Sequence, residues 1–425
     1  MNFLSWLKKG SLAVIDQGLF SGANFIVNIL LARWLTPEEY GAFAVAMSVF
    51  YLLAGFHTAV LTEPMMVFGA GKYRESFRKY LGMLLYGHWG IAAIISLALG
   101  VAALVTSHYG SKVLSHALAG LAIASPFLLL FWLARRACYV PMRPVWAVIG
   151  SAMNLVIVVA GVFLLWRASL LSGFSGLVLL GVAAGVASLV ALAPVRPQVA
   201  GFAGNPTVGM VISDHQGYGV WIVAEGLAYS TFAQLWIILV PAFLGFRGSA
   251  AILAVLNMYK PAYLLMQSVA LILLPSFVRL SKNSTPQAFY KKVSHLGITL
   301  GIVMLLYATT ITVSGKKLLH LFYAGKYDEH VSLAAILGIT LVVAALTQIA
   351  ILALKSHNRI TGLMYVWGVA TLGALGTSIP LMMMFGVNGA ALGYLLGYTL
   401  ACWTVYHQLR MIKNDKTTAE TPPTV

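Results

Sequence analysis

Lys260 is the residue with the clearest chemical consequence, because it lies ten residues into an apolar stretch that spans 250–280. A lysine near the centre of a membrane helix costs roughly 2.5–3.5 kcal/mol on insertion scales, which makes it a candidate functional group. Asn257 and Gln267 share its helical face, and Pro261 beside it can distort the helix and free a carbonyl. We expect Asn257, Lys260 and Gln267 to line a substrate cavity in which the ammonium binds an anion as a compact point charge.

A polar stripe runs along the first apolar stretch and consists of Gln17, Ser21, Asn24 and Asn28, at i, i+4, i+7 and i+11. This spacing places the four side chains on one face of a helix, and lipid does not solvate such a face. The functional interpretation is the wall of an aqueous cavity that hydrogen-bonds sugar hydroxyls. The alternative is that the amides join this helix to its neighbours.

An aromatic face is predicted in the segment that precedes the Lys260 segment. It contains Tyr218, Glu225, Tyr229, Phe232 and Trp236 at helical spacing. Sugar rings stack their apolar faces on aromatic rings, so we expect Tyr229 and Trp236 to contact a carbohydrate substrate. The alternative is ordinary packing or an aromatic belt at the membrane interface.

Three acids are candidates for coupling transport to a proton or cation: Asp16, Glu63 and Glu225. Glu225 lies about eight residues into its apolar stretch, roughly 12 Å deep at about 1.5 Å per residue, and is the strongest candidate. For Asp16 we favour a structural cap or a snorkelling role over coupling. An ion pair between Glu225 and Lys260 is the structural alternative to a substrate contact at the lysine.

The two cysteines, Cys138 and Cys402, provide neither a disulfide framework nor metal-ligand spacing. His57 and His88 are isolated in the sequence, and we interpret both as packed side chains rather than as a relay. We therefore expect no metal and no cofactor.

The composition sets the class of protein. The chain has 425 residues, of which 60% are hydrophobic and 9% are charged, with a mean hydropathy of +0.88. A soluble domain carries about 25% charged residues, so this chain is expected to be a multi-pass membrane protein. Its net charge of +16 does not indicate a nucleic-acid partner, because no soluble surface is available to present it.

Twelve apolar stretches are long enough to cross a bilayer, which takes roughly 20 residues. They lie at about 11–33, 40–66, 80–106, 113–138, 145–167, 171–193, 217–246, 250–280, 290–314, 330–355, 362–384 and 388–410. With the N-terminus in the cytoplasm, 19 of the 27 Lys and Arg residues fall on the cytoplasmic side, seven fall outside, and Lys260 lies within a span. This asymmetry predicts that both termini are cytoplasmic.

Short matches between the two halves of the chain predict a duplication. Residues 17–19 correspond to 225–227 at an offset of 208, and residues 173–176 correspond to 386–389 at an offset of 213. Six spans per half make the repeats parallel, and transporters of that plan place their substrate between the halves. We therefore predict an all-α fold with two six-helix lobes related by a parallel pseudo-two-fold repeat.

The predicted domain organisation follows from these spans. It comprises an N-terminal lobe at 1–200, a cytoplasmic linker at 201–216, a C-terminal lobe at 217–412 and a cytoplasmic tail at 413–425.

Two segments carry a resemblance to a known family. LLARWLTPEEYGAFA at 30–44 and FGVNGAALG at 385–393 resemble the first-loop signature and the final span of polysaccharide exporters and O-antigen-type lipid-linked oligosaccharide flippases. These belong to the multidrug/oligosaccharidyl-lipid/polysaccharide exporter (MOP) superfamily. The resemblance implies a flippase rather than an enzyme, resident in the bacterial cytoplasmic (inner) membrane. Its lobes would rock around a central cavity that carries an undecaprenyl-pyrophosphate-linked saccharide.

The resemblance also gives the candidate site residues their partners. The Lys260 ammonium would receive the substrate pyrophosphate, and the cavity would be completed by Gln17, Asn24, Asn28, Tyr229, Trp236, Asn257 and Gln267. Membrane lipids and other polysaccharide-assembly membrane proteins are the further partners that it implies.

Two alternatives stay open. A multidrug or cation antiporter of the same fold predicts an acidic, apolar cavity, whereas this sequence offers amides, aromatics and a lysine. A polytopic glycan polymerase or ligase predicts a sizeable outer loop with catalytic side chains, and the largest outer loop spans only 314–329.

Overall fold

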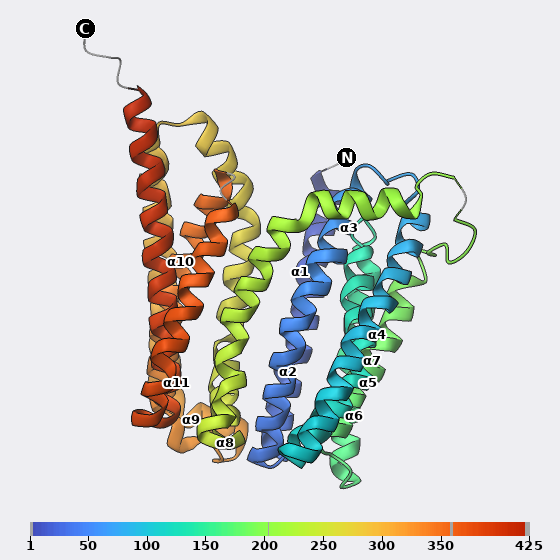
Figure 1. The fold of residues 1–425 in the computed structure, drawn as a ribbon, viewed down its shortest axis with the longest axis vertical. Coiled ribbons are helices and arrows are strands. Elements are labelled where there is room, and N and C mark those ends of the chain that lie inside the picture. The colour runs from blue at the N-terminus through green and yellow to red at the C-terminus, as the bar shows by residue number, and fades with distance from the viewer. Residues whose placement is uncertain (1–2, 203, 358–359, 421–425) are drawn as a thin grey trace. The chain divides into compact units, whose positions relative to one another are not determined.

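The computed structural model describes residues 3–202, 204–357 and 360–420, and every regular element in these ranges is a helix (Figure 1). The first part of the chain forms α1 (Phe3–Trp34), α2 (Pro37–His57), the π-helix η1 (Thr58–Thr62), α3 (Glu63–Ala70), α4 (Phe77–Tyr109), α5 (Lys112–Ala137), α6 (Pro144–Arg167) and α7 (Gly173–Leu192). The remainder forms α8 (Val208–Asn283), α9 (Pro286–Tyr323), the 3-10 helix η2 (Asp328–His330), α10 (Ser332–Ser356) and α11 (Ile360–Glu420).

Ten helical segments in the described chain are long and apolar enough to cross a membrane. Two of them, Val223–Ser281 and Thr361–Ile412, are far longer than one crossing requires. Each is broken at one glycine with a positive φ: Gly245 at 67° and Gly386 at 57°. Dividing both at these glycines gives 10 + 2 = 12 spans, as the sequence predicts.

The chain divides into two compact units, Met1–Leu227 and Ala228–Val425, which we call unit 1 and unit 2. The division falls within α8 and therefore lies later in the chain than the predicted linker at 201–216. That linker is only partly irregular, because α8 already begins at Val208. Its first turns belong to unit 1 and are held there by side-chain contacts.

The contacts that hold the start of α8 involve two neighbouring side chains. The Asp214 carboxylate accepts hydrogen bonds from the Lys72 ammonium at 2.7 and 2.8 Å and from the Tyr73 hydroxyl. The His215 ring lies 2.8 Å from the Val60 carbonyl oxygen and 2.7 Å from the Tyr80 hydroxyl. The Lys72 and Tyr73 hydrogen bonds keep the pKa of Asp214 below its ordinary value. The carboxylate therefore stays ionised and bound at neutral pH.

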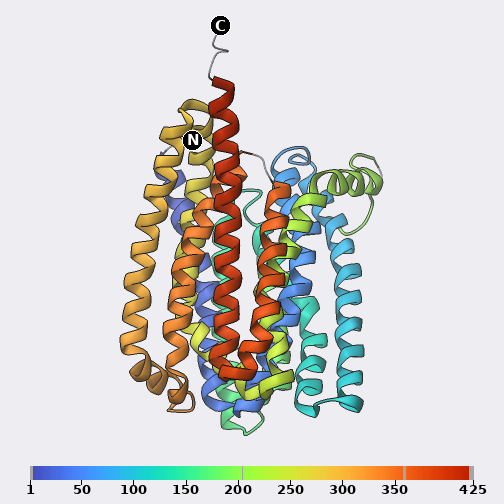
Figure 2. The ribbon, with the colours of Figure 1, turned by 60° about the vertical axis from the view of Figure 1, so that its left-hand side comes forward.

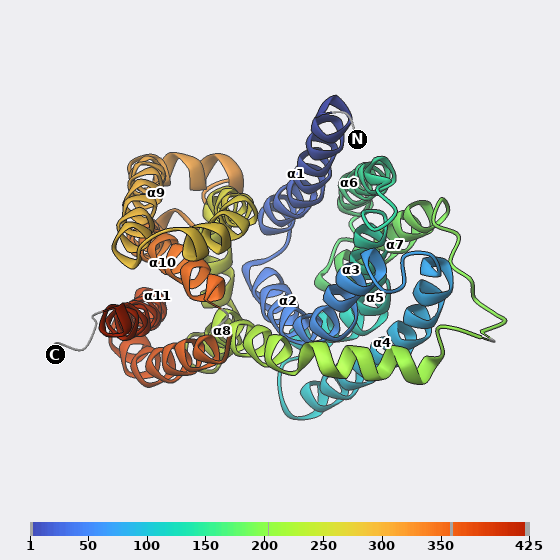
Figure 3. The same cartoon turned by 90° about the horizontal axis from the view of Figure 1, so that it is seen from above.

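Helix α5 lies among α2, α4 and α7 in the interior of unit 1 (Figure 3). Small residues allow close approach to α7: a Cβ atom on Gly181 would lie 2.7 Å from Ala124 Cα. In membranes, where lipid is as apolar as a side chain, such close packing drives helix association. Unit 1 therefore has a densely packed centre formed by α5 and α7. Helices α1 and α6 pack against each other, and α6 also packs against α7.

In unit 2, α10 packs between α9 and α11 (Figure 2). Tyrosine hydroxyls fasten the second half of α8 to this group. Tyr307 donates to the Met258 carbonyl at 2.7 Å, and Tyr323 donates to the Ala254 carbonyl at 2.9 Å. These bonds fix the backbone immediately before Lys260, so the position of the lysine is set by neighbouring helices.

Candidate functional site

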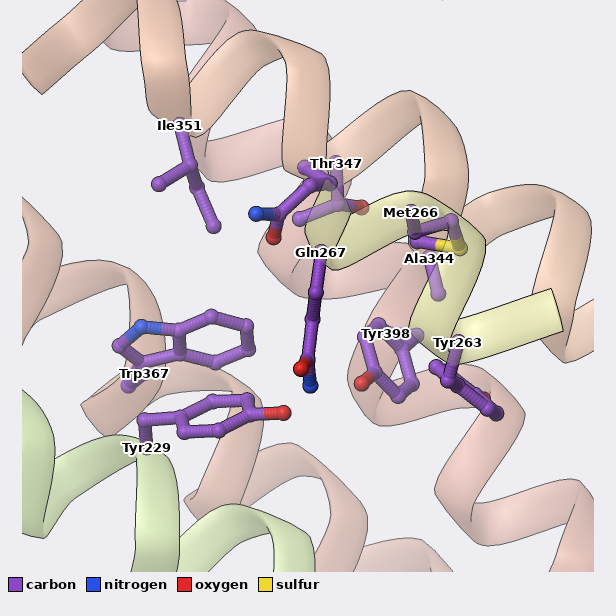
Figure 4. Close-up of a pocket in the computed structure, with 10 residues that line it drawn as sticks. Tyr229, Tyr263, Met266, Gln267, Ala344, Thr347, Ile351, Trp367 and Tyr398 are labelled. Carbon is purple, nitrogen blue, oxygen red and sulfur yellow. The ribbon is translucent and has the colours of Figure 1, made fainter. Parts of the chain in front are cut away.

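An open cavity with about 400 Å³ of free space lies within unit 2. Side chains from α8, α10 and α11 line it, and Figure 4 shows their arrangement: Tyr229, Tyr263, Met266, Gln267, Ala344, Thr347, Gln348, Ile351, Trp367 and Tyr398. Ligand sites in proteins commonly combine apolar walls with a few polar groups. Among the described residues, none that lines this cavity carries a formal charge.

The aromatic wall is formed by rings from different helices. Tyr229 on α8 packs against Trp367 on α11, with ring centroids 4.8 Å apart and an interplanar angle of 59°. The Gln267 side chain extends between this pair and the rings of Tyr263 and Tyr398 (Figure 4). The cavity thus combines aromatic faces for stacking with an amide that can donate and accept hydrogen bonds.

Trp236 does not form part of the wall. Its side chain is only 3% exposed and stacks on Tyr394 at a centroid distance of 4.3 Å. Phe232, also buried, lies between the rings of Trp367 and Tyr398. The aromatic face expected on α8 therefore has two roles: Tyr229 is 42% exposed and faces the cavity, while Phe232 and Trp236 support the rings behind it.

The polar face around Lys260 also divides. Gln267 is exposed and lines the cavity. Lys260 is half-buried two turns earlier, and none of the ion pairs among the described residues includes it. Asn257 is fully buried beside the Tyr323 hydroxyl, where it contributes to the α8–α9 contact. Glu225 lies in unit 1 and is half-buried, so the proposed ion pair between Glu225 and Lys260 stays a prediction.

In unit 1, Asp16 is the centre of a buried polar network. Its carboxylate accepts hydrogen bonds from Arg135 at 3.2 Å, from the Ser151 hydroxyl at 2.6 Å and from the Tyr139 hydroxyl. Burial, and then the hydrogen bond to Asp16, raise the pKa of Tyr139 well above its ordinary value, so the phenol remains a donor. The Arg135 guanidinium also lies 4.0 Å from the centre of the Phe20 ring. This network joins α1, α5 and α6.

The polar stripe of α1 makes contacts within unit 1. Gln17 accepts from Arg135 and donates to Ser21 at 3.1 Å. Asn28 is buried, and it accepts from the Tyr40 hydroxyl at 3.4 Å. Asn24 is half-buried and donates to the Phe20 carbonyl within its own helix. These contacts fit the helix-joining interpretation for Gln17 and Asn28, and the cavity role of the stripe stays a prediction.

Glu63 begins α3 directly after the π-helix η1 and is half-buried, close enough to Arg136 on α5 for their charges to interact. π-helical turns are rare and occur frequently at functional sites. The Thr62 hydroxyl on this turn is buried. Glu63, a candidate for coupling, thus has a basic neighbour, Arg136, that the sequence spacing does not predict.

The two histidines that look isolated in the sequence form a pair. His57 Nε2 on α2 lies 3.0 Å from His88 Nδ1 on α4, and both side chains are fully buried. Their other ring nitrogens, His57 Nδ1 and His88 Nε2, have no hydrogen-bond partner in the described chain. Both histidines are packed in the interior, as expected, and they contact each other. Because they are 31 residues apart in the sequence, their spacing does not predict this contact. No group of three or more metal-binding side chains is found among the described residues.

Comparison with known proteins places the fold. No protein-family model and no curated protein sequence matches the chain. Among solved structures, an inward-facing multidrug resistance MATE family transporter of the MOP superfamily is similar with a TM-score of 0.79 and 12% identity, over 95% of this chain and 96% of that one. The lipid II flippase MurJ in an inward closed conformation is similar with a TM-score of 0.72 and 12% identity, over 95% and 87%.

A MOP superfamily transporter from Pyrococcus furiosus, whose structure was described as having a binding pocket of reversed polarity, is similar with a TM-score of 0.66 and 11% identity, over 96% and 95%. At these identities the likeness concerns the fold. The chain is therefore a multi-pass membrane protein that has the fold of these solved structures.

Proposed function

We propose that the chain is a flippase that moves a lipid-linked oligosaccharide or polysaccharide precursor across the bacterial cytoplasmic membrane by alternating access, with both termini in the cytoplasm. The observation that carries this proposal is the cavity of unit 2. Its described lining is aromatic and amide-bearing and has no formal charge. Stacking rings with hydrogen-bonding amides suit a saccharide better than they suit a cationic drug, for which an acid would be the natural partner.

Lys260 is the proposed partner of the anionic part of this substrate. It lies one turn before Tyr263 and two turns before Gln267 on α8, both of which line the cavity. Its ammonium is not engaged by an acid in any ion pair of the described chain. We infer that it contacts the undecaprenyl-linked pyrophosphate while the saccharide occupies the aromatic wall.

Coupling is assigned to unit 1, which contains all three acid candidates, Asp16, Glu63 and Glu225. Asp16 accepts hydrogen bonds from α5, from α6 and from the connection between them, which favours a structural role for it over coupling. Glu63 and Glu225 stay candidates on the basis of their intramembrane positions.

The test is transport by the purified protein in liposomes, with an undecaprenyl-pyrophosphate-linked oligosaccharide whose sugars are detected by a lectin on one side. Tyr229→Ala removes the ring of the wall that is 42% exposed and should reduce transport about tenfold, which corresponds to about 1.4 kcal/mol. Tyr365→Ala is the matched control, because it removes the same side chain at a position that is 64% exposed and does not line the cavity.

A multidrug transporter is the second candidate, favoured by the MATE neighbours and by the ability of aromatic rings to hold planar cations. Transport of a planar cationic dye at wild-type rates, with no movement of the lipid-linked saccharide, would establish this function and exclude the flippase.

A further inference from the structure

An open pocket with about 1270 Å³ of free space lies at one end of unit 1, where three connections of the chain meet. These are the α3–α4 connection (71–76), the α5–α6 connection (138–143) and the segment that follows α7 (193–196). Exposed arginines line the pocket together with a single acid, Glu75: they are Arg74, Arg78, Arg143 and Arg196. The pocket belongs to unit 1 alone, whereas the cavity proposed for the saccharide belongs to unit 2.

Two of the arginines are anchored to the backbone of the opposite connection. Arg78 donates through Nε to the Arg196 carbonyl at 2.8 Å, and Arg143 donates through Nη1 to the Pro194 carbonyl at 2.8 Å. A guanidinium has five N–H donors, so each of these bonds fixes the position of the group and leaves further donors for a ligand. A planar, pre-positioned guanidinium matches the oxygen geometry of phosphate.

The backbone around the pocket is held in unusual conformations. Four non-glycine residues in the described chain have a positive φ, and two of them, Met142 at 58° and Arg196 at 50°, are in the pocket connections. Such conformations persist only where the surroundings hold them, and they concentrate at ligand clamps and active sites. Helices α4 and α6 also begin here, and neither has a side-chain cap. Their first N–H groups therefore add positive potential.

Membrane topology alone does not account for this arrangement. It requires only that Lys and Arg be more frequent in the loops on one side. It does not require four arginine side chains, three of them from different connections and one from the first turn of α4, to line one pocket, where backbone hydrogen bonds hold Arg78 and Arg143 in place. The convergence indicates a ligand with several negatively charged oxygens.

The surface next to the pocket indicates what carries that anion. Helix α6 leaves the pocket with its apolar side chains exposed: Val145 is 43% exposed, Trp146 36%, Ile149 39% and Val156 65%. Trp146 also lines the pocket itself. Tryptophan favours the interface between headgroups and acyl chains. A phosphate in the pocket would have an apolar helix face directly beside it, along which acyl chains can lie.

We propose that this arginine pocket binds the phosphate of a lipid headgroup, with the acyl chains along α6. Basic pockets between membrane helices are known to hold anionic lipid headgroups. This binding is independent of the saccharide cavity, so it stands whether or not the proposed transport function is correct.

The test is native mass spectrometry of the full-length protein in detergent, titrated with phosphatidylglycerol and with phosphatidylcholine of the same acyl chains. Phosphatidylglycerol should bind at least tenfold more tightly. The double variant Arg74→Gln with Arg196→Gln should bind phosphatidylglycerol about 25-fold more weakly. Each basic residue near a membrane surface contributes about fivefold in affinity, and two such residues are removed. Glu75→Gln removes the single acid and should strengthen binding.

The matched control is Arg167→Gln, which removes an exposed arginine from the opposite end of α6 and should leave binding unchanged. Equal binding of the two lipids, or equal weakening by Arg167→Gln, would overturn the proposal. So would displacement of the lipid by millimolar inorganic pyrophosphate with no preference for any lipid, because the site would then serve a soluble phosphate. Undecaprenyl pyrophosphate in the same titration shows which phosphate lipid is preferred, and tighter binding of either one supports the proposal.

Discussion

The interior acids of unit 1 lie next to charges of opposite sign. The cavity of unit 2, in contrast, is lined by neutral rings and amides. Lys260 lies near this cavity and belongs to none of the ion pairs of the described chain. In unit 1, Asp16 is held by Arg135, and Glu63 lies near Arg136. One unit thus has interior acids that lie next to arginines, and the other has a cavity lined by uncharged side chains. Under the proposed function, charge coupling and saccharide contact are separate tasks of the two units.

The largest effect is expected from Asp16→Asn. Removing one partner of a buried ion pair costs about 3–5 kcal/mol, because the Arg135 guanidinium is left uncompensated. The free energy of unfolding in a detergent–denaturant titration should fall by that amount. Ser151→Ala, which removes one neutral donor, should cost only about 1 kcal/mol. If Asp16→Asn abolishes transport but leaves the free energy of unfolding unchanged, Asp16 is a coupling residue and the structural account of unit 1 is incorrect.

Lys260→Gln should have the opposite pattern in unit 2. Stability should stay constant or rise, because removing this charge breaks no described ion pair. Transport of a pyrophosphate-linked substrate should fall about 10- to 100-fold, as expected for loss of a hydrogen bond to a charged group, about 1.5–3 kcal/mol. Rates are measured in liposomes at equal protein abundance. A loss of stability that Glu225→Gln restores would instead show that the lysine serves a structural ion pair.

The histidine pair sharpens the comparison within unit 1. His57→Leu leaves the facing nitrogen of His88 buried without a partner, which should cost about 1–3 kcal/mol of unfolding free energy. Replacing both histidines with leucine should recover part of that loss, and the double-mutant cycle gives the coupling between them. Additive losses would indicate that the 3.0 Å contact contributes nothing to stability.

The smallest effect concerns the docking of the α8 start on unit 1. The pKa of Asp214 is lowered in the folded protein, so its stabilising contribution is present above the unfolded pKa, near 3.9, and is lost as the pH falls below it. Because Lys72 is 48% exposed, the expected contribution is under about 1 kcal/mol. Hydrogen exchange of residues 208–217 should accelerate below about pH 4, and Asp214→Asn should show that faster exchange at neutral pH.

Features set by local composition could be predicted from the sequence. The twelve spans follow from apolar length, and the break before the last span falls at Gly386, the first residue of the glycine-rich segment expected to open it. Contacts between distant residues could not be predicted. Asp16 and Ser151 are separated by 135 positions, and periodicity on one helix does not reveal which neighbour faces it. For the same reason the pattern of α8 does not distinguish Tyr229, which lines the cavity, from Trp236, which is buried behind it.

The two glycine breaks of unit 2 have a practical consequence for this membrane protein. At Gly245 and at Gly386 one span follows another with a single non-helical residue between them, so these turns contain almost no irregular backbone. Proteases and inserted sequences require several flexible, accessible residues. We therefore expect that both turns resist proteolysis and reject an inserted epitope tag, whereas the irregular segment after α7 accepts one.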